Sequence, residues 1–347
     1  MRKERKSNLE LLRITAMLLI VASHYAGWVV PAFAAERISV NRILNQTLCF
    51  GGGAGNILFF LISGYFFQNS FSKKKIFVVW SEMFFYSVIC FIAAYILSGV
   101  VGIGSLIAAI FPFSHGEYWF MTSYMILMIL LPWIGILIDN MDCRQHKRLL
   151  LLLFLFCSVI PSIPGCPTTA ISDAGFYLFI YLTGTYVRRY PNIYSESRKL
   201  NMAAVLICLV SIAGSIVCFD FLGKNGGFFA ENAGYFTRMR SPFVILFSWA
   251  LFNVFRKMEM KDNKVINYIS GSVFAVYLIH NNKNIRSYIW ENIFKNIEAD
   301  SLYLPLHLII SVSGIFVVCV LFDTLRREIL ERPLVTWIDK HPWNKKA

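Results

Sequence analysis

Long apolar segments recur from one end of this 347-residue chain to the other, and they constrain its fold more than any other feature. A helix of about 20 apolar residues matches the thickness of the hydrocarbon core of a bilayer. Backbone groups inside lipid must be hydrogen-bonded within the protein, which favours helices for such segments. Only 15% of the residues are charged, a smaller share than soluble domains carry. The sequence therefore predicts an all-α integral membrane protein, a polytopic bundle.

The apolar segments divide into about ten transmembrane helices. We expect these helices at about 9–30, 54–71, 76–98, 118–138, 149–163, 172–187, 200–222, 241–255, 265–280 and 302–322. The segment 99–114 is apolar but rich in glycine and contains Pro112, so we expect it to be re-entrant or interfacial. The polar stretches are too short to fold alone. We therefore expect a membrane-embedded domain over residues 1–325 and a short cytoplasmic tail over residues 326–347.

The distribution of basic residues predicts the orientation of the bundle. With ten spans, the loops on the side of the N-terminus contain 24 Lys and Arg residues, whereas the loops on the opposite side contain 8. Cytoplasmic loops are enriched in Lys and Arg, so both termini are expected in the cytoplasm. This topology also accounts for the net charge of +13. Since no basic stripe interleaved with exposed aromatic residues is visible, nucleic acid is not an expected partner.

The first 35 residues have the outline of a secretory signal. They have a basic start, an apolar middle and the small-residue sequence Ala32-Phe33-Ala34. The apolar part is too long for a signal peptide, and it contains Arg13 and His24. We therefore expect this segment to be a retained first span.

The eight cysteines are scattered along the chain. They form no CxxC pair and no Cys/His cluster with the spacing of metal ligands, so no metal site is predicted. Most lie in apolar segments and are expected to be small core residues. Cys49 and Cys166 both lie near the predicted outer surface, and the sequence leaves open whether they pair.

Arg13 and His24 are ionisable residues inside the first apolar segment. Their separation of eleven residues is three helical turns plus about 20°, so both lie on one face, roughly 16 Å apart along the axis. Ionisable residues in hydrocarbon are costly and usually mark a functional site. Glu10 lies on the same face and can pair with Arg13. The alternatives are an arginine that reaches the cytoplasmic surface and a histidine bonded to a neighbouring helix.

Several segments resemble a known family in the same order along the chain. Asn8-Leu9-Glu10-Leu11-Leu12-Arg13, followed by Ala16 to Val21 and by His24-Tyr25, resembles the first helix of the membrane-bound acyltransferase-3 family. That helix is marked by an Arg, ten residues and a His. Further segments resemble later helices of the family: 58–65, Tyr118-Trp119-Phe120 with Tyr124, 182–186 and 274–280. The resemblance covers about residues 8–325.

The resemblance implies an enzyme. Members of this family move an acyl group, usually acetyl, from cytoplasmic acyl-CoA to a hydroxyl of a cell-envelope polysaccharide or of its lipid-linked sugar precursor. The implied protein is a multi-pass O-acyltransferase of the bacterial plasma membrane, with the bilayer, acyl-CoA and an envelope glycan as partners and no metal. His24 would act as the general base or carry the acyl group as a nucleophile. Arg13 would hold a phosphate or polarise the thioester carbonyl.

An anionic donor is expected to dock on the basic cytoplasmic rim. Besides Arg13, the candidates for its phosphates are Lys73, Lys74, Lys75, Arg188 and Arg189. Each of these five residues has a second interpretation as a topology signal among lipid headgroups. Family members often carry an arginine-containing basic motif after the second helix. Here Lys75 is followed by an apolar run without Arg, which weakens the case for the three lysines.

Contacts with the acceptor are expected near the outer surface. The candidates are Glu117, Trp119, Tyr124 and His280, of which Glu117 would orient the sugar or His24, and His280 would position the acceptor. Aromatic residues and histidines at a membrane interface are the alternative interpretation.

Five other residues have weaker claims to a functional role. Trp290 and Tyr288 are expected either to stack on a sugar or to anchor at the headgroups. His146 and His341 lie in cytoplasmic segments and are expected to be solvated, and His307 has no evident partner in the sequence.

Two competing functions follow from the same residues. A transporter of a small solute would use Arg13 and His24 as a proton relay or anion site. Transporters often show internal repeats, and none is evident between the two halves of the chain. A structural membrane subunit would leave both residues without a role. The sequence leaves open the acceptor sugar, the hydroxyl, the length of the acyl chain and the oligomeric state.

Overall fold

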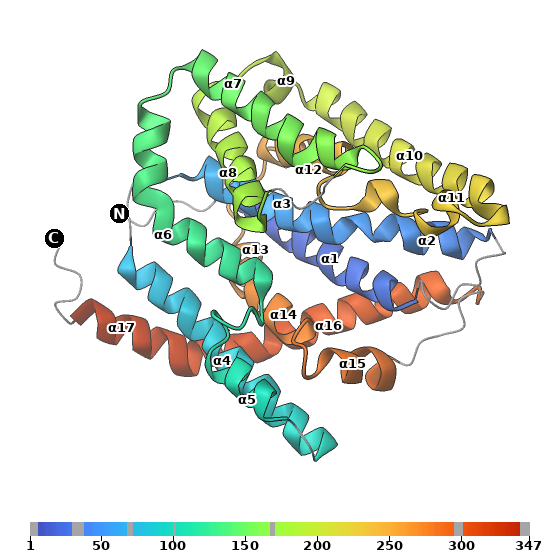
Figure 1. The fold of residues 1–347 in the computed structure, drawn as a ribbon. Helices are drawn as coiled ribbons and strands as arrows, with labels where there is room; N and C mark the ends of the chain where they lie inside the picture. Colours follow the sequence, from blue (N-terminus) through green and yellow to red (C-terminus); the bar gives the residue numbers. More distant parts are fainter. Residues whose placement is uncertain are drawn as a thin grey trace. The chain divides into compact units, whose positions relative to one another are not determined.

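The structure is a computed structural model that describes residues 6–29, 38–67, 72–99, 102–166, 171–294 and 301–340. Within these ranges every regular element is a helix and there is no strand (Figure 1). The all-α class expected from the apolar segments is therefore confirmed.

Among the residues that the structure describes, six helical stretches are long and apolar enough to cross a membrane. The first three contain α1 (Ser7–Val29), α2 (Val40–Leu48) continued by α3 (Phe50–Tyr65), and α4 (Lys73–Ser98). The others contain α6 (Trp119–Asp139), α10 (Arg198–Leu222) and α16 (Leu304–Arg326). Several such helices in one chain are typical of a multi-pass integral membrane protein. The second span begins earlier than the sequence predicts, because α2 and α3 form one continuous stretch from Val40 to Tyr65.

The other four predicted spans are helical but are not among these six stretches. They correspond to α7 (Cys143–Phe154), which continues through a π-helical and a 3-10 turn to Ser162, and to α8 (Asp173–Arg189), α12 (Pro242–Arg256) and α13 (Lys264–Ile269) with α14 (Val273–His280). α8 has 17 residues and α12 has 15, so neither reaches the length of the other spans. Ten spans therefore stay a prediction. The glycine-rich segment contains α5 (Ile103–Ile110), whose 8 residues are too short to cross a membrane.

The chain divides into two compact units, each built from segments far apart in the sequence. Unit 1 comprises residues 1–67, 138–270 and 296–313, and unit 2 comprises residues 68–137, 271–295 and 314–347. The predicted cytoplasmic tail is helical as far as Lys340, with α17 (Arg332–Lys340) as its last element.

In unit 1, α3 lies directly against α1 (Figure 1). Gly51 and Gly55, four residues apart, face α1. A Cβ atom at Gly51 would lie 2.6 Å from the carbonyl oxygen of Leu19, and one at Gly55 would lie 2.5 Å from that of Ala16. Small residues at this spacing let helix backbones approach closely in a membrane. The glycines therefore fix the position of the helix that bears Arg13 and His24.

The contact between α3 and α8 is equally close and is reciprocal. A Cβ atom at Gly64 of α3 would lie 2.0 Å from the carbonyl oxygen of Tyr181, and one at Gly184 of α8 would lie 2.3 Å from that of Leu61. Thr185 donates hydrogen bonds to the carbonyl oxygens of Tyr181 (3.0 Å) and Gly64 (3.3 Å). The two glycines belong to two of the segments that resemble the family, and close packing of α3 on α8 explains both.

We expect Gly184→Ala to lower the stability of the protein by about 1–3 kcal/mol, because the added methyl group meets the backbone of α3 and forces a shift. Thermal unfolding of the purified protein in detergent measures this. Gly214→Ala is the matched control, since a Cβ atom at this position of α10 meets nothing within 4 Å. Equal unfolding temperatures for the two variants would contradict the close contact.

Unit 2 contains a buried ionic cluster. The guanidinium of Arg326 donates from Nε to Asp323 (2.7 Å) and from Nη2 to Glu331 (2.7 Å), and it lies 3.5 Å from Glu82 of α4. Tyr86 donates its hydroxyl hydrogen to the same Asp323 oxygen (2.7 Å). The side chains of Asp323 and Arg326 are 0% and 5% exposed. These interactions join α4 to the C-terminal end of α16.

Candidate active site

The N-terminal end of α1 is held by polar side chains. Asn8 donates from its amide to the carbonyl oxygens of Phe255 (2.9 Å), Arg256 (3.2 Å) and Met258 (3.2 Å), at the end of α12. The Ser7 hydroxyl bonds the side chain of Asn267 (3.0 Å). The last carbonyls of a helix need such partners, so Asn8 stabilises α12 while it positions α1.

Arg13 forms the predicted ion pair with Glu10. Its Nη1 lies 3.0 Å from both carboxylate oxygens of Glu10, and Ser270 donates a hydrogen bond of 2.6 Å to the same carboxylate. The Arg13 side chain is 31% exposed, whereas that of Glu10 is 8% exposed. The ion pair uses one of the guanidinium nitrogens, and a guanidinium has five N–H donors. Arg13 can therefore bind an anion or a carbonyl oxygen without leaving Glu10.

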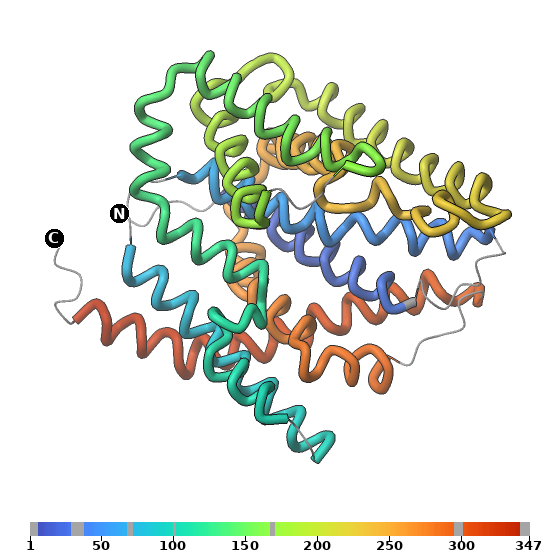
Figure 2. Tube along the Cα trace, viewed as in Figure 1, coloured from blue at the N-terminus to red at the C-terminus, as the bar shows by residue number. Residues whose placement is uncertain are grey.

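His24 lies on the same unbroken helix, which Figure 2 traces in dark blue. It is partly buried, as is Arg13. Met17 and Ile20 lie between them on the same face and are 0% and 1% exposed. The face that bears the two candidate residues is therefore packed inside the protein at its centre, and it is not turned to lipid there.

Both neighbours of His24 in the sequence are fixed. The Ser23 hydroxyl donates to the carbonyl oxygen of Cys49 (3.0 Å), at the junction of α2 and α3. The Tyr25 hydroxyl lies 2.7 Å from Nδ1 of His307, and Tyr25 is 0% exposed. These two contacts set the rotation of α1 at the histidine, so the side chain of His24 emerges in a fixed direction.

Arg188 and Arg189 bind the ends of neighbouring helices. Nη1 of Arg188 donates to the carbonyl oxygen of Tyr65 (3.0 Å), at the end of α3. Nη1 of Arg189 donates to the carbonyl oxygen of Ile138 (2.9 Å), and its Nη2 pairs with Asp139. Both arginines therefore stabilise helix ends. A donor phosphate would have to bind the guanidinium N–H groups that these contacts do not use.

Lys73, Lys74 and Lys75 form the first turn of α4 after Ser72, whose hydroxyl accepts a hydrogen bond from the backbone of Lys75 (3.3 Å). Lys74 pairs with Asp339 of α17, whereas Lys73 and Lys75 are exposed. The three lysines lie in unit 2, and Arg13, Arg188 and Arg189 lie in unit 1.

Glu117 and the region of His280 come together in unit 2. The Glu117 side chain is 3% exposed and accepts a hydrogen bond from the backbone of Lys283 (3.3 Å). Tyr118 and Asn282 are both 0% exposed, and Asn282 donates to the Tyr118 hydroxyl (2.7 Å). Glu117 is thus a buried carboxylate that contacts Lys283, three residues beyond the end of α14, and its second oxygen lies 3.9 Å from Nζ of this lysine. Buried carboxylates are uncommon unless they are paired in this way.

His280 is enclosed within unit 2. It is 0% exposed, and its ring nitrogen Nδ1 lies 2.5 Å from the carbonyl oxygen of Val276 in the same helix. Trp119 of α6 is 41% exposed, and the ring of Tyr124 packs against Phe274 at 5.7 Å. Of the four candidates for acceptor contacts, Trp119 is the one with a largely accessible side chain.

Two predicted surface residues are buried. Trp290 is 1% exposed, so neither of its interpretations, a stacking surface or a headgroup anchor, fits the structure. His146 was expected to be solvated, yet it is 0% exposed and bonds through Nε2 to the carbonyl oxygen of Leu182 (3.2 Å). Burial lowers the pKa of His146, so the ring stays neutral. His341 lies outside the described residues, and Cys49 and Cys166 are both free thiols.

Two contacts of the candidate site and one buried cluster were not predicted from the sequence. His307 binds Tyr25 and Ser270 binds Glu10, although each is more than 250 residues away in the chain. The cluster around Arg326 was also missed. Asp323 and Arg326 are three residues apart, a spacing typical of helical ion pairs, and this spacing inside an apolar segment was the available signal.

Comparison with known proteins identifies the family of this chain. The chain matches the family described as "Acyltransferase domain", of acyltransferase 3, over residues 6–324. No curated protein and no solved structure matches it significantly. The match covers nearly the whole chain and includes Arg13, His24 and every other candidate residue. This chain therefore belongs to the acyltransferase-3 family, a family of integral membrane acyltransferases.

Proposed function

We propose that this protein is an O-acyltransferase that moves an acyl group, acetyl in the simplest case, from cytoplasmic acyl-CoA to a hydroxyl of a cell-envelope sugar or of a lipid-linked precursor. The observation that carries the proposal is the placement of Arg13 and His24 on one face of a continuous helix, where Glu10 holds Arg13 and hydrogen bonds fix the residues on either side of His24. The family supplies the reaction class, and these two residues supply a cation and a base.

The chemistry follows from the two side chains. The neutral imidazole of His24 takes the proton of the acceptor hydroxyl as the oxygen attacks the thioester carbonyl carbon. Arg13 lies roughly 16 Å from His24 along the helix axis, so it would hold a phosphate of the donor and would not contact the oxyanion that forms beside the imidazole. The bond from carbon to sulfur then breaks, and the imidazolium returns the proton to the thiolate of CoA. If His24 acts first as the nucleophile, the same bond breaks to give an acyl-imidazole, which the hydroxyl then attacks.

Glu10 supports the role proposed for Arg13. Because the Glu10 carboxylate holds Nη1 and is itself held by Ser270, the guanidinium has a fixed origin and a fixed direction. A guanidinium held in this way presents its remaining donors to a phosphate of the donor in a fixed direction. The other donor-binding candidates, Lys73, Lys75 and the two arginines of α8, would add attraction for the CoA phosphates at the cytoplasmic rim.

The proposed acceptor side consists of Glu117, Trp119, Tyr124 and His280. Trp119 offers an accessible ring for a sugar, whereas Glu117 and His280 are buried and would act by holding the neighbouring backbone and rings in place. In the proposed topology the chain has ten spans, and both termini lie in the cytoplasm. The donor would then enter from the cytoplasm near Arg13, and the acceptor would approach from the outer side near His24.

The direct test supplies the purified protein in detergent with labelled acetyl-CoA and extracted envelope glycan. We expect label on the glycan that mild base releases, as an ester requires. If no label is transferred, and vesicles that contain the protein instead accumulate a small solute without any acyl donor, the transporter interpretation replaces the proposal.

A further inference from the structure

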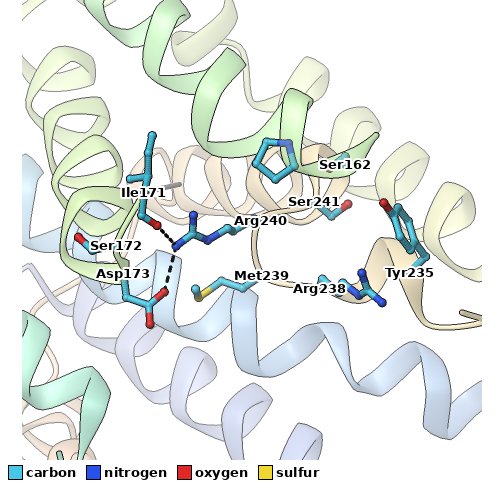
Figure 3. A pocket seen from close by; sticks show the side chains of 10 residues that line it. Ser162, Ile171, Ser172, Asp173, Tyr235, Arg238, Met239, Arg240 and Ser241 are labelled. Atoms are coloured by element: carbon cyan, nitrogen blue, oxygen red, sulfur yellow. Dashed lines mark hydrogen bonds and ion pairs between the residues drawn. The ribbon is translucent and has the colours of Figure 1, made fainter. Parts of the chain in front are cut away.

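Unit 1 contains a cavity that the proposed reaction has not used. Its volume is 580 Å³, within the range of small-ligand sites. Figure 3 shows the side chains that surround it, from the start of α8 and from the segment 235–241 that leads into α12. Both wall segments adjoin loops that the charge distribution assigns to the outer side of the membrane.

Two arginines give this cavity a positive charge. Nη2 of Arg240 donates to the carbonyl oxygen of Ile171 (2.7 Å) and to Asp173 (3.1 Å), as the dashed lines in Figure 3 show. Arg238 lies 4.5 Å from the ring of Tyr235 and donates to the side chain of Asn232 (2.9 Å). Among the described residues that line the cavity, Asp173 is the one carboxylate, so the two arginines leave a net charge of one positive unit.

Two polar atoms in the cavity wall lack partners. Nη1 of Arg240 and the hydroxyl oxygen of Ser241 are buried, and neither has a hydrogen-bond partner among the residues that the structure describes. Ser241 is 3% exposed. A buried donor without a partner costs free energy, so its presence beside a cavity indicates a ligand that completes its hydrogen bonds.

The cavity is connected to the helix of His24 through α3. Met239, in the cavity wall, packs against Gly53, where an added Cβ atom would lie 2.7 Å from its Cα. The adjacent Gly52 faces Ser23, and a Cβ atom added there would lie 2.8 Å from the Ser23 hydroxyl oxygen. One short stretch of α3 therefore separates the cavity from the residue that precedes His24.

We propose that this cavity binds the acceptor, and that the acceptor is an anionic saccharide. Its carboxylate or phosphate would bind Arg238 and Nη1 of Arg240, since guanidinium groups recognise both anions through paired hydrogen bonds. Its hydroxyl groups would bond the hydroxyls that line the wall, among them Ser241 and Tyr235. This inference rests on the proposed function, because it names the substrate of the same reaction.

Arg238→Gln tests the inference, because Arg238 is exposed and its replacement leaves the ion pair of Arg240 intact. The protein is placed in nanodiscs of neutral lipid, and binding of a galacturonic acid trisaccharide is compared with that of the galactose trisaccharide, without acyl donor. We expect wild type to prefer the acidic sugar about tenfold or more, and Arg238→Gln to lose this preference. Lys224→Gln, which removes an exposed cation of the same loop outside the cavity, should retain it.

A second variant separates a loss of binding from a loss of folding. Ser241→Ala removes a hydroxyl that has no partner within the described residues, and it should weaken binding of both trisaccharides with little change in unfolding temperature. Equal preference in wild type and Arg238→Gln overturns the inference. Displacement of the acidic sugar by acyl-CoA, or its loss in nanodiscs of anionic lipid, also overturns it, since the cavity would then hold the donor or a headgroup. Binding as expected without any acyl transfer would instead refute the proposed function.

Discussion

His24→Ala is expected to lower the rate of acyl transfer by about 10²–10⁴-fold, the range that a general base contributes. Without the imidazole, the acceptor hydroxyl has no group to take its proton as it attacks the thioester. The protein should remain folded, because the helix around position 24 is held by Ser23 and Tyr25. Transfer of label from acetyl-CoA to the glycan measures the effect.

His115→Ala serves as the control, since His115 is an exposed histidine in unit 2 and is expected to leave transfer unchanged. Equal transfer by His24→Ala and wild type would refute the role of His24. The two proposed mechanisms also differ in a measurable way. If His24 carries the acyl group, wild type incubated with labelled donor alone should acquire label on the protein, and His24→Ala should not.

Arg326→Met is expected to destabilise the protein by about 3–5 kcal/mol, because it leaves buried carboxylates without their cation. Asp323 and Glu82 are 0% and 9% exposed in their side chains, so water cannot replace the guanidinium. Thermal unfolding in detergent measures the loss. The Tyr86 hydroxyl, which shares the Asp323 oxygen, keeps one hydrogen bond to the cluster.

Arg332→Met provides the comparison for this variant. Arg332 pairs with Glu328, but its side chain is 65% exposed, so its loss should cost less than about 1 kcal/mol. Adding Asp323→Asn to Arg326→Met should restore part of the stability, since it removes one of the uncompensated charges. If the two arginine variants unfold at the same temperature, the cluster does not stabilise unit 2.

The helices could be predicted from the sequence because apolar length and charge are local properties. The first span, the pairing of Glu10 with Arg13, and the shared helix of Arg13 and His24 all follow from spacing along one segment. The bounds of α8 and α12 also lie within two residues of those predicted, 172–187 and 241–255. The sequence did not show that α2 and α3 form one stretch that begins at Val40, because that segment is partly polar.

Local sequence patterns do not predict the hydrogen-bond partners of the residues in the candidate site. Nothing near Tyr25 indicates that His307 will lie 2.7 Å away, and nothing near Glu10 points to Ser270. The burial of His146 and Trp290 was missed for the same reason, since a polar or amphipathic residue in a loop is usually exposed. Tertiary packing, which a single sequence does not display, decided these positions.

The fastening of α1 at both ends has a mechanical consequence. Ser7 and Asn8 attach its start to the segment that follows α12, and Tyr25 attaches its far end to His307. Sliding or rotation of α1 would break the hydrogen bonds at both of its ends. We therefore expect the helix to stay fixed during the reaction, while the pantetheine arm of the donor and the incoming sugar move along it.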